Sequence, residues 1–127
     1  MNVKRAVPLI LLDQNVPRAL ASLLPGHTVR TAADQGWEEL TNGDLLKAAN
    51  EAGFSLLVTA DQNIIYQQNM KARAIGLIVL STNHWPTLRA NSDRIVQAVD
   101  HLPPAGYAFV ECGLQPKRRR PAPTRKL

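Results

Sequence analysis

The feature that most constrains the fold is a series of five short apolar runs spaced along the chain. They lie at residues 8–13, 27–32, 55–60, 76–81 and 107–112. Continuous apolar runs of this length are typical of strands that are covered on both faces. Glu111 interrupts the fifth run, which predicts a more exposed strand. Because longer segments separate the runs, the pattern predicts strands joined by helical crossovers, and therefore an α/β fold with a parallel sheet.

The connecting segments carry the signals of helices. Asn15, with Pro17 in the first turn, is suited to cap a first helix, and Thr41 with Asp44 has the form of a helix start. Apolar residues recur at helical spacing in three of the segments, whereas the segment before the fourth strand is helical by composition and has only a weak apolar stripe. The predicted helices run from Asn15 to Leu24, from the start at Thr41 to an end at Gly53, over residues 62–73, and from Leu88 to Leu102.

Positive charge is concentrated at the carboxyl end of the chain. The 127 residues carry a net charge of +5, and residues 115–127 hold six of the 15 basic side chains, three prolines and no acidic residue. The remainder of the chain is close to neutral. A chain of this length fits one domain with one core. We therefore expect an α/β domain over residues 1–114 and a basic, proline-rich, disordered tail over residues 115–127.

The sequence also indicates where in the cell the protein is expected. No stretch approaches the roughly 18 consecutive apolar residues that a membrane span requires. The apolar run near the start is too short for a signal peptide, and Asp13 follows it where a cleavage site would be expected. Cys112 is the single cysteine, so an internal disulfide is excluded. These features predict a cytoplasmic protein that does not enter a membrane.

Two of the predicted strands end in an aspartate. Asp13 follows the first strand and Asp61 follows the third, while Asp44 begins the helix that leads into the third strand. With right-handed crossovers, the carboxyl ends of parallel strands meet at one edge of the sheet, where α/β proteins bind ligands. If the first and third strands are neighbours, the carboxylates could share an ion. Oxygen ligands suit Mg²⁺ or Mn²⁺, which can activate water for phosphodiester cleavage.

The same aspartates have a structural interpretation. Asp44 lies where a carboxylate favours the helix dipole, a stabilisation of about 0.3–1 kcal/mol. Asp13 or Asp61 could cap the helix that follows it, which stabilises a helix by about 1 kcal/mol. No histidines or cysteines have the spacing of a zinc site, and the glycine-rich nucleotide-binding motifs do not occur in the sequence. Position alone leaves the metal site and the capping role both open.

Several polar residues are candidates for binding a nucleic acid. Asn15 and Asn63 each lie two residues after an aspartate and could hold a metal or a phosphate, although asparagine is also common in turns. The helix predicted at 62–73 is unusually polar, which fits either a solvated face or a wall that contacts nucleic acid. Trp37 and Trp85 could each stack on a base or cover the core. The candidates for substrate binding are Asn15, Tyr66, Gln67, Lys71, Arg73, His84, Arg118 and Arg119.

The basic tail has two interpretations. Its lysines and arginines can neutralise phosphates without fixed structure, which adds salt-sensitive affinity for any nucleic acid. The tail could equally serve only to keep the protein in solution.

Three segments resemble a known family. LLDQNVP near the start, NGDLLKAANEAGFSLLVTADQN in the middle and GLIVLS after it are similar to the PIN-like nuclease superfamily, in particular to its short prokaryotic branch. The resemblance covers about residues 8–101. Its most specific part is D-x-x-x-A, then a glycine, then a strand that ends in T-x-D, from Asp44 through Asp61.

This resemblance implies a three-layer α/β/α sandwich with a mostly parallel five-stranded sheet. It implies that Asp13, Asp44 and Asp61 are catalytic and bind Mg²⁺ or Mn²⁺ for RNA hydrolysis, with Asn63 as a further metal ligand. Many members of the family are toxins of toxin–antitoxin pairs and form dimers. RNA, an antitoxin protein and a second copy of the chain are therefore expected partners.

The chain differs from the family pattern in two places. Many PIN proteins have T-x-D-x-D, and here Asn63 replaces the second acid, so the site loses a charge. Longer members carry a glutamate on an early helix, and Glu38 and Glu39 lie instead in a predicted loop. Three carboxylates thus remain where other members have four, which predicts a lower affinity for the metal.

Three functional hypotheses follow. The first is a metal-dependent endoribonuclease, and the second is a non-catalytic PIN-like module that binds RNA or a partner protein, which the replacement by Asn63 suggests. The third is a receiver-like phosphorylation domain, because Asp61 ends the third strand and Ser81 the fourth. Against the third, Gln14 rather than a second acid follows Asp13, and no lysine ends the fifth strand.

Overall fold

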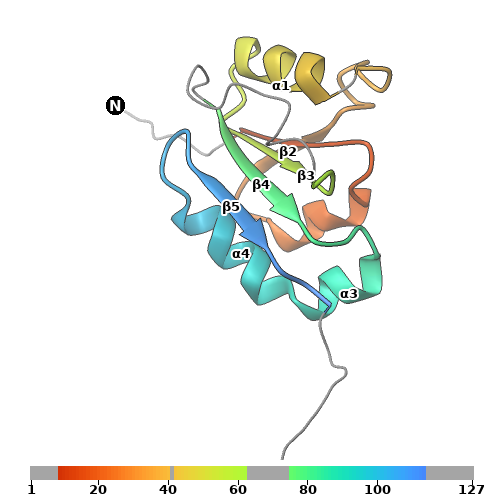
Figure 1. The fold of residues 1–127 in the computed structure, drawn as a ribbon, viewed down its shortest axis with the longest axis vertical. Helices are drawn as coiled ribbons and strands as arrows, with labels where there is room; N and C mark the ends of the chain where they lie inside the picture. Colours follow the sequence, from red (N-terminus) through yellow and green to blue (C-terminus); the bar gives the residue numbers. More distant parts are fainter. Residues whose placement is uncertain (1–8, 41, 63–74, 114–127) are drawn as a thin grey trace, which may run out of the picture.

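The protein is an α/β domain built on one five-stranded sheet in which every pair of neighbouring strands is parallel (Figure 1). The computed structural model describes residues 9–40, 42–62 and 75–113. The strand order is β2-β1-β3-β4-β5. All five predicted strands are confirmed, each within two residues of its expected ends. They are β1 (Leu9–Leu12), β2 (Thr28–Thr31), β3 (Leu56–Thr59), β4 (Gly76–Leu80) and β5 (Tyr107–Val110).

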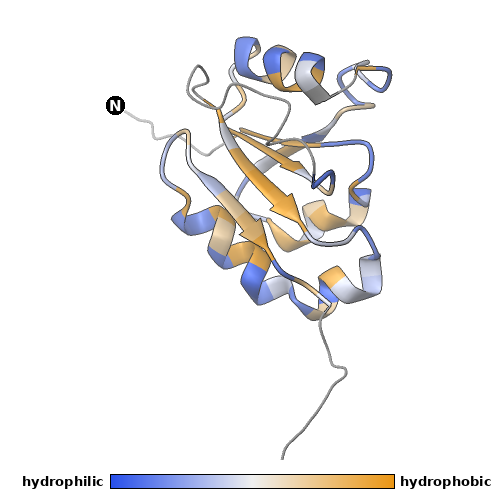
Figure 2. Cartoon of the chain, in the orientation of Figure 1, coloured by the Kyte–Doolittle hydropathy of each residue, from blue (hydrophilic) through white to orange (hydrophobic). Residues whose placement is uncertain are grey.

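Helices cover both faces of the sheet, which gives the expected three layers (Figure 1). One face is covered by α1 (Asn42–Glu51). The other face is covered by η1 (Arg18–Leu23), α3 (Trp85–Ala90) and α4 (Ser92–His101). Figure 2 shows apolar strands in the middle of the molecule and polar residues on the outer sides of the helices. No helix among the described residues is long and apolar enough to cross a membrane.

The alternation of side chains along each strand divides the core into two clusters. Ile10 and Leu12 of β1 pack toward η1, α3 and α4, whereas Leu11 packs toward α1. In β3, Leu57 likewise belongs to the cluster beneath α1. Because successive residues of a strand point to opposite faces, a sheet covered on both sides requires the continuous apolar runs that the sequence contains.

The observed helices differ from the predicted ones in two respects, the type of the first helix and a break within the fourth. The first helix is a short 3₁₀ helix rather than an α-helix, and Pro17 lies at its start without a side-chain capping bond. The prediction that Asn15 caps this helix is therefore wrong. The fourth predicted helix is divided into α3 and α4 at Asn91, whose side-chain amide donates to the carbonyl of Thr87 at 2.8 Å.

The second predicted helix is confirmed, and so is its end at Gly53. This glycine has a φ of +90°, which an L-residue with a side chain rarely adopts. The amide of Gly53 donates to the carbonyl of Asn50, and the amide of Phe54 donates to that of Ala49. This pair of bonds is the Schellman arrangement, which closes the helix and turns Phe54 back into the core. The helix predicted at 62–73 and the tail at 115–127 lie outside the described residues.

The crossovers do not all have the same hand. The connections from β2 to β3 and from β4 to β5 both step in the same direction across the sheet, but they pass over opposite faces. Two such crossovers have opposite hands. Because about 98% of crossovers between parallel strands are right-handed, the expectation of uniformly right-handed crossovers is wrong for one of the two. The five carboxyl ends nevertheless share one edge of the sheet.

Candidate functional site

The candidate site lies where the strand order changes direction, at the carboxyl ends of β1 and β3. The chain leaves β1 toward β2 on one side, and β3 pairs with β1 on the other side. Crevices at such a switch point are the usual ligand sites of open α/β sheets. Asp13 directly follows β1, and Asp61 lies two residues beyond the end of β3. The condition for bringing these two aspartates together, that the first and third strands are neighbours, is therefore met.

Asp13 is held in place by hydrogen bonds to its amide and to both oxygens of its carboxylate. Its amide donates to the carbonyl of Val58 at 2.9 Å, which extends the pairing of β1 with β3 by one residue. One carboxylate oxygen, Oδ2, accepts a bond of 2.7 Å from the hydroxyl of Thr59. The other, Oδ1, accepts a bond of 2.7 Å from the amide of Gln14. The half-buried carboxylate therefore has a fixed position at the end of the strand.

Thr59 connects the two aspartates. It is the one fully buried polar residue among those described, with 0% exposure. Its hydroxyl donates to Asp13 and accepts a bond of 3.0 Å from the amide of Asp61. The main chain of Asp61 is thus two hydrogen bonds away from the Asp13 carboxylate. Sequence reasoning missed Thr59 as a site residue, although it is the threonine of the T-x-D motif that resembles the PIN-like family.

Asn15 belongs to the same site and makes a contact that the sequence did not predict. Its side-chain oxygen accepts a bond of 3.1 Å from the amide of Ala60, so it links the loop after β1 to the end of β3. The oxygen that could coordinate a metal is engaged with the backbone. The NH₂ group is a donor only, which suits a phosphate oxygen and not a cation.

Two further side chains connect the neighbouring strand ends. Gln62 donates through Nε2 to the carbonyl of Ser81 at 3.0 Å, which ties the turn after β3 to the end of β4. The hydroxyl of Ser81 donates to the carbonyl of Cys112 at 2.8 Å and accepts from the amide of Cys112 at 2.7 Å. The carboxyl ends of β3, β4 and β5 are therefore fixed relative to one another.

Asp44 is exposed in the first turn of α1, as expected for a residue that begins a helix. Over residues 9–40, 42–62 and 75–113, no group of three or more histidine, cysteine, aspartate or glutamate residues is placed to hold a metal ion. Asp44 therefore does not join Asp13 and Asp61 in such a group. The aspartate pair at the switch point remains as the candidate for binding an ion.

The other candidates are only partly described. His84 is exposed, precedes α3, and its Nδ1 is 2.9 Å from the hydroxyl of Thr87. It follows β4 at the same edge of the sheet as Asp13. The remaining predicted site residues lie outside the described residues, and they are Asn63, Tyr66, Gln67, Lys71, Arg73, Arg118 and Arg119.

Both tryptophans pack against the hydrophobic core. Trp37 packs against the cluster beneath α1, and its ring meets that of Phe54 edge-on at a centroid distance of 6.0 Å. Trp85 packs against the cluster on the opposite face. Both are half-buried, which favours a role in covering the core over stacking on a base. Glu38 and Glu39 are exposed in the loop between β2 and α1.

Comparisons of the chain with protein-family models, with curated proteins and with solved structures found no match. The fold and the geometry at the switch point therefore carry the functional argument.

Proposed function

We propose that this protein is a metal-dependent ribonuclease of PIN-like type, which cleaves phosphodiester bonds with Mg²⁺ or Mn²⁺ held by Asp13 and Asp61. The observation that carries the proposal is the convergence of the two strand-ending aspartates on the β1–β3 switch point, joined through Thr59. The all-parallel sheet between two helical layers is the architecture that the PIN-like resemblance implies.

The donor set at this site fits a hard divalent cation. Carboxylate oxygens are the ligands that Mg²⁺ and Mn²⁺ prefer, and Mg²⁺ typically keeps several waters while one or two carboxylates and the substrate phosphates complete its shell. Two carboxylates are therefore sufficient. Each oxygen of Asp13 accepts one hydrogen bond and retains a second lone pair, which is available to an ion.

Each residue of the site has a distinct task in this proposal. Asp13 and Asp61 hold the ion, and Thr59 orients Asp13 from the buried side. The NH₂ group of Asn15 donates to a phosphate oxygen of the substrate, while its oxygen stays on the amide of Ala60. A bound divalent ion would lower the pKa of a coordinated water and stabilise the charge that develops on the phosphate.

The finer elements of the proposal come from the sequence. Asn63 adds a neutral ligand, and the polar segment at 62–73 and the basic tail contact the RNA backbone. The branch that the chain resembles further suggests a toxin of a toxin–antitoxin pair, a partner antitoxin protein and a cytoplasmic location.

The alternative is a PIN-like module that binds RNA or a partner protein without cleaving it. This alternative is favoured by one observation, that no group of three or more candidate metal-binding side chains forms among the described residues. Binding by such a module would depend on the basic tail and not on a metal.

A receiver-like phosphorylation domain is disfavoured by the face over which the β4–β5 crossover passes. Receiver domains share the strand order 2-1-3-4-5, and this chain has the same order. In a uniformly right-handed fold, however, the β2–β3 and β4–β5 crossovers cover the same face, and here they cover opposite faces. The fifth strand also leads into Glu111-Cys112-Gly113, which contains no lysine.

The test is cleavage of a varied set of RNAs by the purified protein with Mg²⁺ or Mn²⁺. Asp13→Asn and Asp61→Asn should each lower the rate at least a hundredfold, because each removes a charged ligand. Glu51→Gln is the matched control, since it neutralises an exposed carboxylate at the far end of α1. Absence of cleavage by the wild-type protein with either metal would contradict the proposal.

A binding assay separates the two candidates. For the nuclease, RNA binding should weaken when EDTA removes the metal or when Asp61 is changed to Asn. For the non-catalytic module, binding should survive both treatments and be lost when residues 115–127 are deleted. A fluorescently labelled single-stranded RNA provides the readout for both outcomes.

A further inference from the structure

The outer edge of β5 carries backbone groups that the sheet does not use. Within residues 9–40, 42–62 and 75–113, β5 pairs only with β4 and is an edge strand. The amide of Leu77 donates to the carbonyl of Gly106, and the amide of Ser81 donates to the carbonyl of Val110. Because alternate residues of a parallel strand direct their N–H and C=O groups to the same neighbour, the even-numbered residues of β5 face β4. The N–H and C=O groups of Tyr107 and Phe109 therefore face outward.

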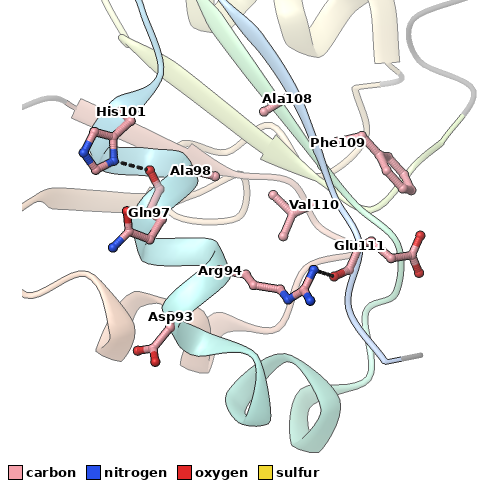
Figure 3. A pocket seen from close by; sticks show the side chains of 9 residues that line it. All are labelled: Asp93, Arg94, Gln97, Ala98, His101, Ala108, Phe109, Val110 and Glu111. Carbon is pink, nitrogen blue, oxygen red and sulfur yellow. Dashed lines mark hydrogen bonds between the residues drawn. The ribbon is translucent and has the colours of Figure 1, made fainter. Parts of the chain in front are cut away.

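This outward-facing stretch has a defined end on either side. Ala105 has a φ of +58°, so the chain is in a turn before β5 begins. At the other end, Nη1 of Arg94 reaches the carbonyl oxygen of Glu111 at 3.5 Å, as Figure 3 shows. Tyr107 and Phe109 are the residues between these two limits whose polar groups remain available for pairing with another strand.

The side chains of the same two residues are exposed as well. Tyr107 and Phe109 are each 43% exposed and are the exposed large hydrophobic residues among those described. Both lie on the α1 side of the sheet, because their partners Leu77 and Val79 belong to the cluster beneath α1. An apolar pair beside an open strand edge is typical of a surface that pairs with another strand.

On the opposite side of β5 lies an open groove of about 630 Å³ between α4 and the strand (Figure 3). Small side chains, Ala98 and Ala108, line one part of it. Asp93, Arg94 and Glu111 lie in the lower part of the view in Figure 3, away from Ala108. The part of the groove beside Ala108 therefore holds no carboxylate or guanidinium that would repel its own copy.

The geometry points to a second copy of this chain as the occupant, paired through β5 in antiparallel orientation across a two-fold axis at Ala108. In this register Tyr107 of one copy lies opposite Phe109 of the other, and both residues direct N–H and C=O groups across the interface. Four hydrogen bonds form, and two Tyr–Phe cross-strand pairs cover the exposed rings. The two sheets become one continuous sheet.

The two ends of the open stretch of β5 favour the register centred on Ala108 over the registers shifted by one residue. A shift that centres the axis on Tyr107 would place Phe109 opposite Ala105, which is in the turn and not extended. A shift that centres it on Phe109 would place Tyr107 opposite Glu111, whose carbonyl is already engaged by Arg94. Centring on Ala108 uses every outward group of Tyr107 and Phe109 and no others.

The register is tested by cross-linking the full-length protein. Residues directly opposite in a non-hydrogen-bonded antiparallel pair have Cα atoms about 4.5 Å apart, which is within the range that a disulfide spans. Ala108→Cys should therefore form a disulfide-linked dimer on mild oxidation, seen by intact mass. The wild-type protein is the background control, because its single cysteine, Cys112, is buried. Tyr107→Cys should cross-link much less, and the reverse order would overturn the register.

The interface is tested by sedimentation of the wild-type protein and of two variants at Phe109. The wild type should sediment at twice the 14.0 kDa mass of the chain. Phe109→Pro should dissociate the dimer at least tenfold more readily and keep the urea transition of the fold, because it removes an outward N–H that β4 does not use. Phe109→Val keeps that N–H and should weaken the dimer less. A monomeric wild type, or an unchanged dimer in Phe109→Pro, would overturn the proposal.

Discussion

Replacing Thr59 by valine should separate two contributions to stability. One comes from the hydrogen bonds of Thr59 at the switch point, and the other comes from its packing in the core. Valine has nearly the same shape, so the change removes the hydroxyl and little else. Two hydrogen bonds are lost, one to the Asp13 carboxylate at 2.7 Å and one from the Asp61 amide at 3.0 Å. Because Thr59 is 0% exposed, water cannot readily supply the two hydrogen bonds that its hydroxyl makes.

The magnitude follows from the charge of the partners. A hydrogen bond to a charged group contributes about 1.5–3 kcal/mol and one between neutral groups about 0.5–1.5 kcal/mol. The added methyl group of valine offsets about 0.8 kcal/mol by its burial. The free energy of unfolding should therefore fall by about 1.5–3 kcal/mol in Thr59→Val. With a urea slope of about 1–3 kcal/mol per molar, the midpoint of unfolding should move down by roughly 1 M.

The measurement is urea unfolding followed by the fluorescence of Trp37 and Trp85. Thr59→Ser is the matched control, because it keeps the hydroxyl and loses only a methyl group, and it should cost about 1 kcal/mol. Combining Thr59→Val with Asp13→Asn should give a coupling free energy of about 1 kcal/mol or more. A Thr59→Val protein as stable as the wild type, or strictly additive changes in the double variant, would refute the proposed coupling through this hydroxyl.

Three further predictions use other parts of the structure. Burial raises the pKa of the Cys112 thiol, so alkylation at neutral pH should be far slower in the native protein than in urea, and equal rates in the two states would contradict this burial. Leu88→Ala should lower the free energy of unfolding by about 2–5 kcal/mol, since Leu88 is 0% exposed in the cluster shared by η1, α3 and α4; a loss below about 1 kcal/mol, measured by urea unfolding, would refute the packing argument. The backbone hydrogen bond from Thr31 lowers the pKa of Asp34 below its ordinary value of 3.8, so Asp34 stabilises the fold above that pH and this stabilisation is lost as the pH falls through the lowered pKa. The stability difference between wild type and Asp34→Asn should therefore be present at neutral pH and shrink in acid, and a difference that grows in acid would reverse the sign of the argument.

The strands were predictable because their signal is local and repeated. Each is a continuous apolar run that a sheet covered on both faces requires, and the observed ends fall within two residues of the predicted ones. The end of α1 at Gly53 was predictable for the same reason, since a glycine is suited to the left-handed conformation found there.

The helix starts were less predictable because they depend on contacts between distant segments. Asn15 has the residue type of a cap, yet its oxygen bonds to Ala60, 45 residues further along the chain. The division between α3 and α4 was hidden because Leu88 and Ile95 keep helical spacing across the break at Asn91. The hand of the β4–β5 crossover likewise depends on which face α4 covers, and the apolar pattern of a helix does not specify that face.

Part of the candidate site, the two aspartates after the strands, could be predicted from the sequence, and the threonine between them could not. Asp13 and Asp61 were selected because both follow strands, and their convergence depended on strands β1 and β3 being neighbours, which only the structure provides. Thr59 was missed because a buried threonine at a strand end looks like any other strand residue until its partners are known. Asp44 has the expected place on its helix and is not part of a metal-binding group among the described residues.

The most direct test of the central claim is a crystal structure of the protein soaked in Mn²⁺, with the ion located by its anomalous scattering. The account predicts one peak at the carboxyl ends of β1 and β3, within about 2.0–2.3 Å of oxygens from both Asp13 and Asp61. The peak should disappear in Asp61→Asn crystals and persist in Glu51→Gln crystals. An ion bound elsewhere, or no ion at the switch point of the wild-type protein, would contradict the account.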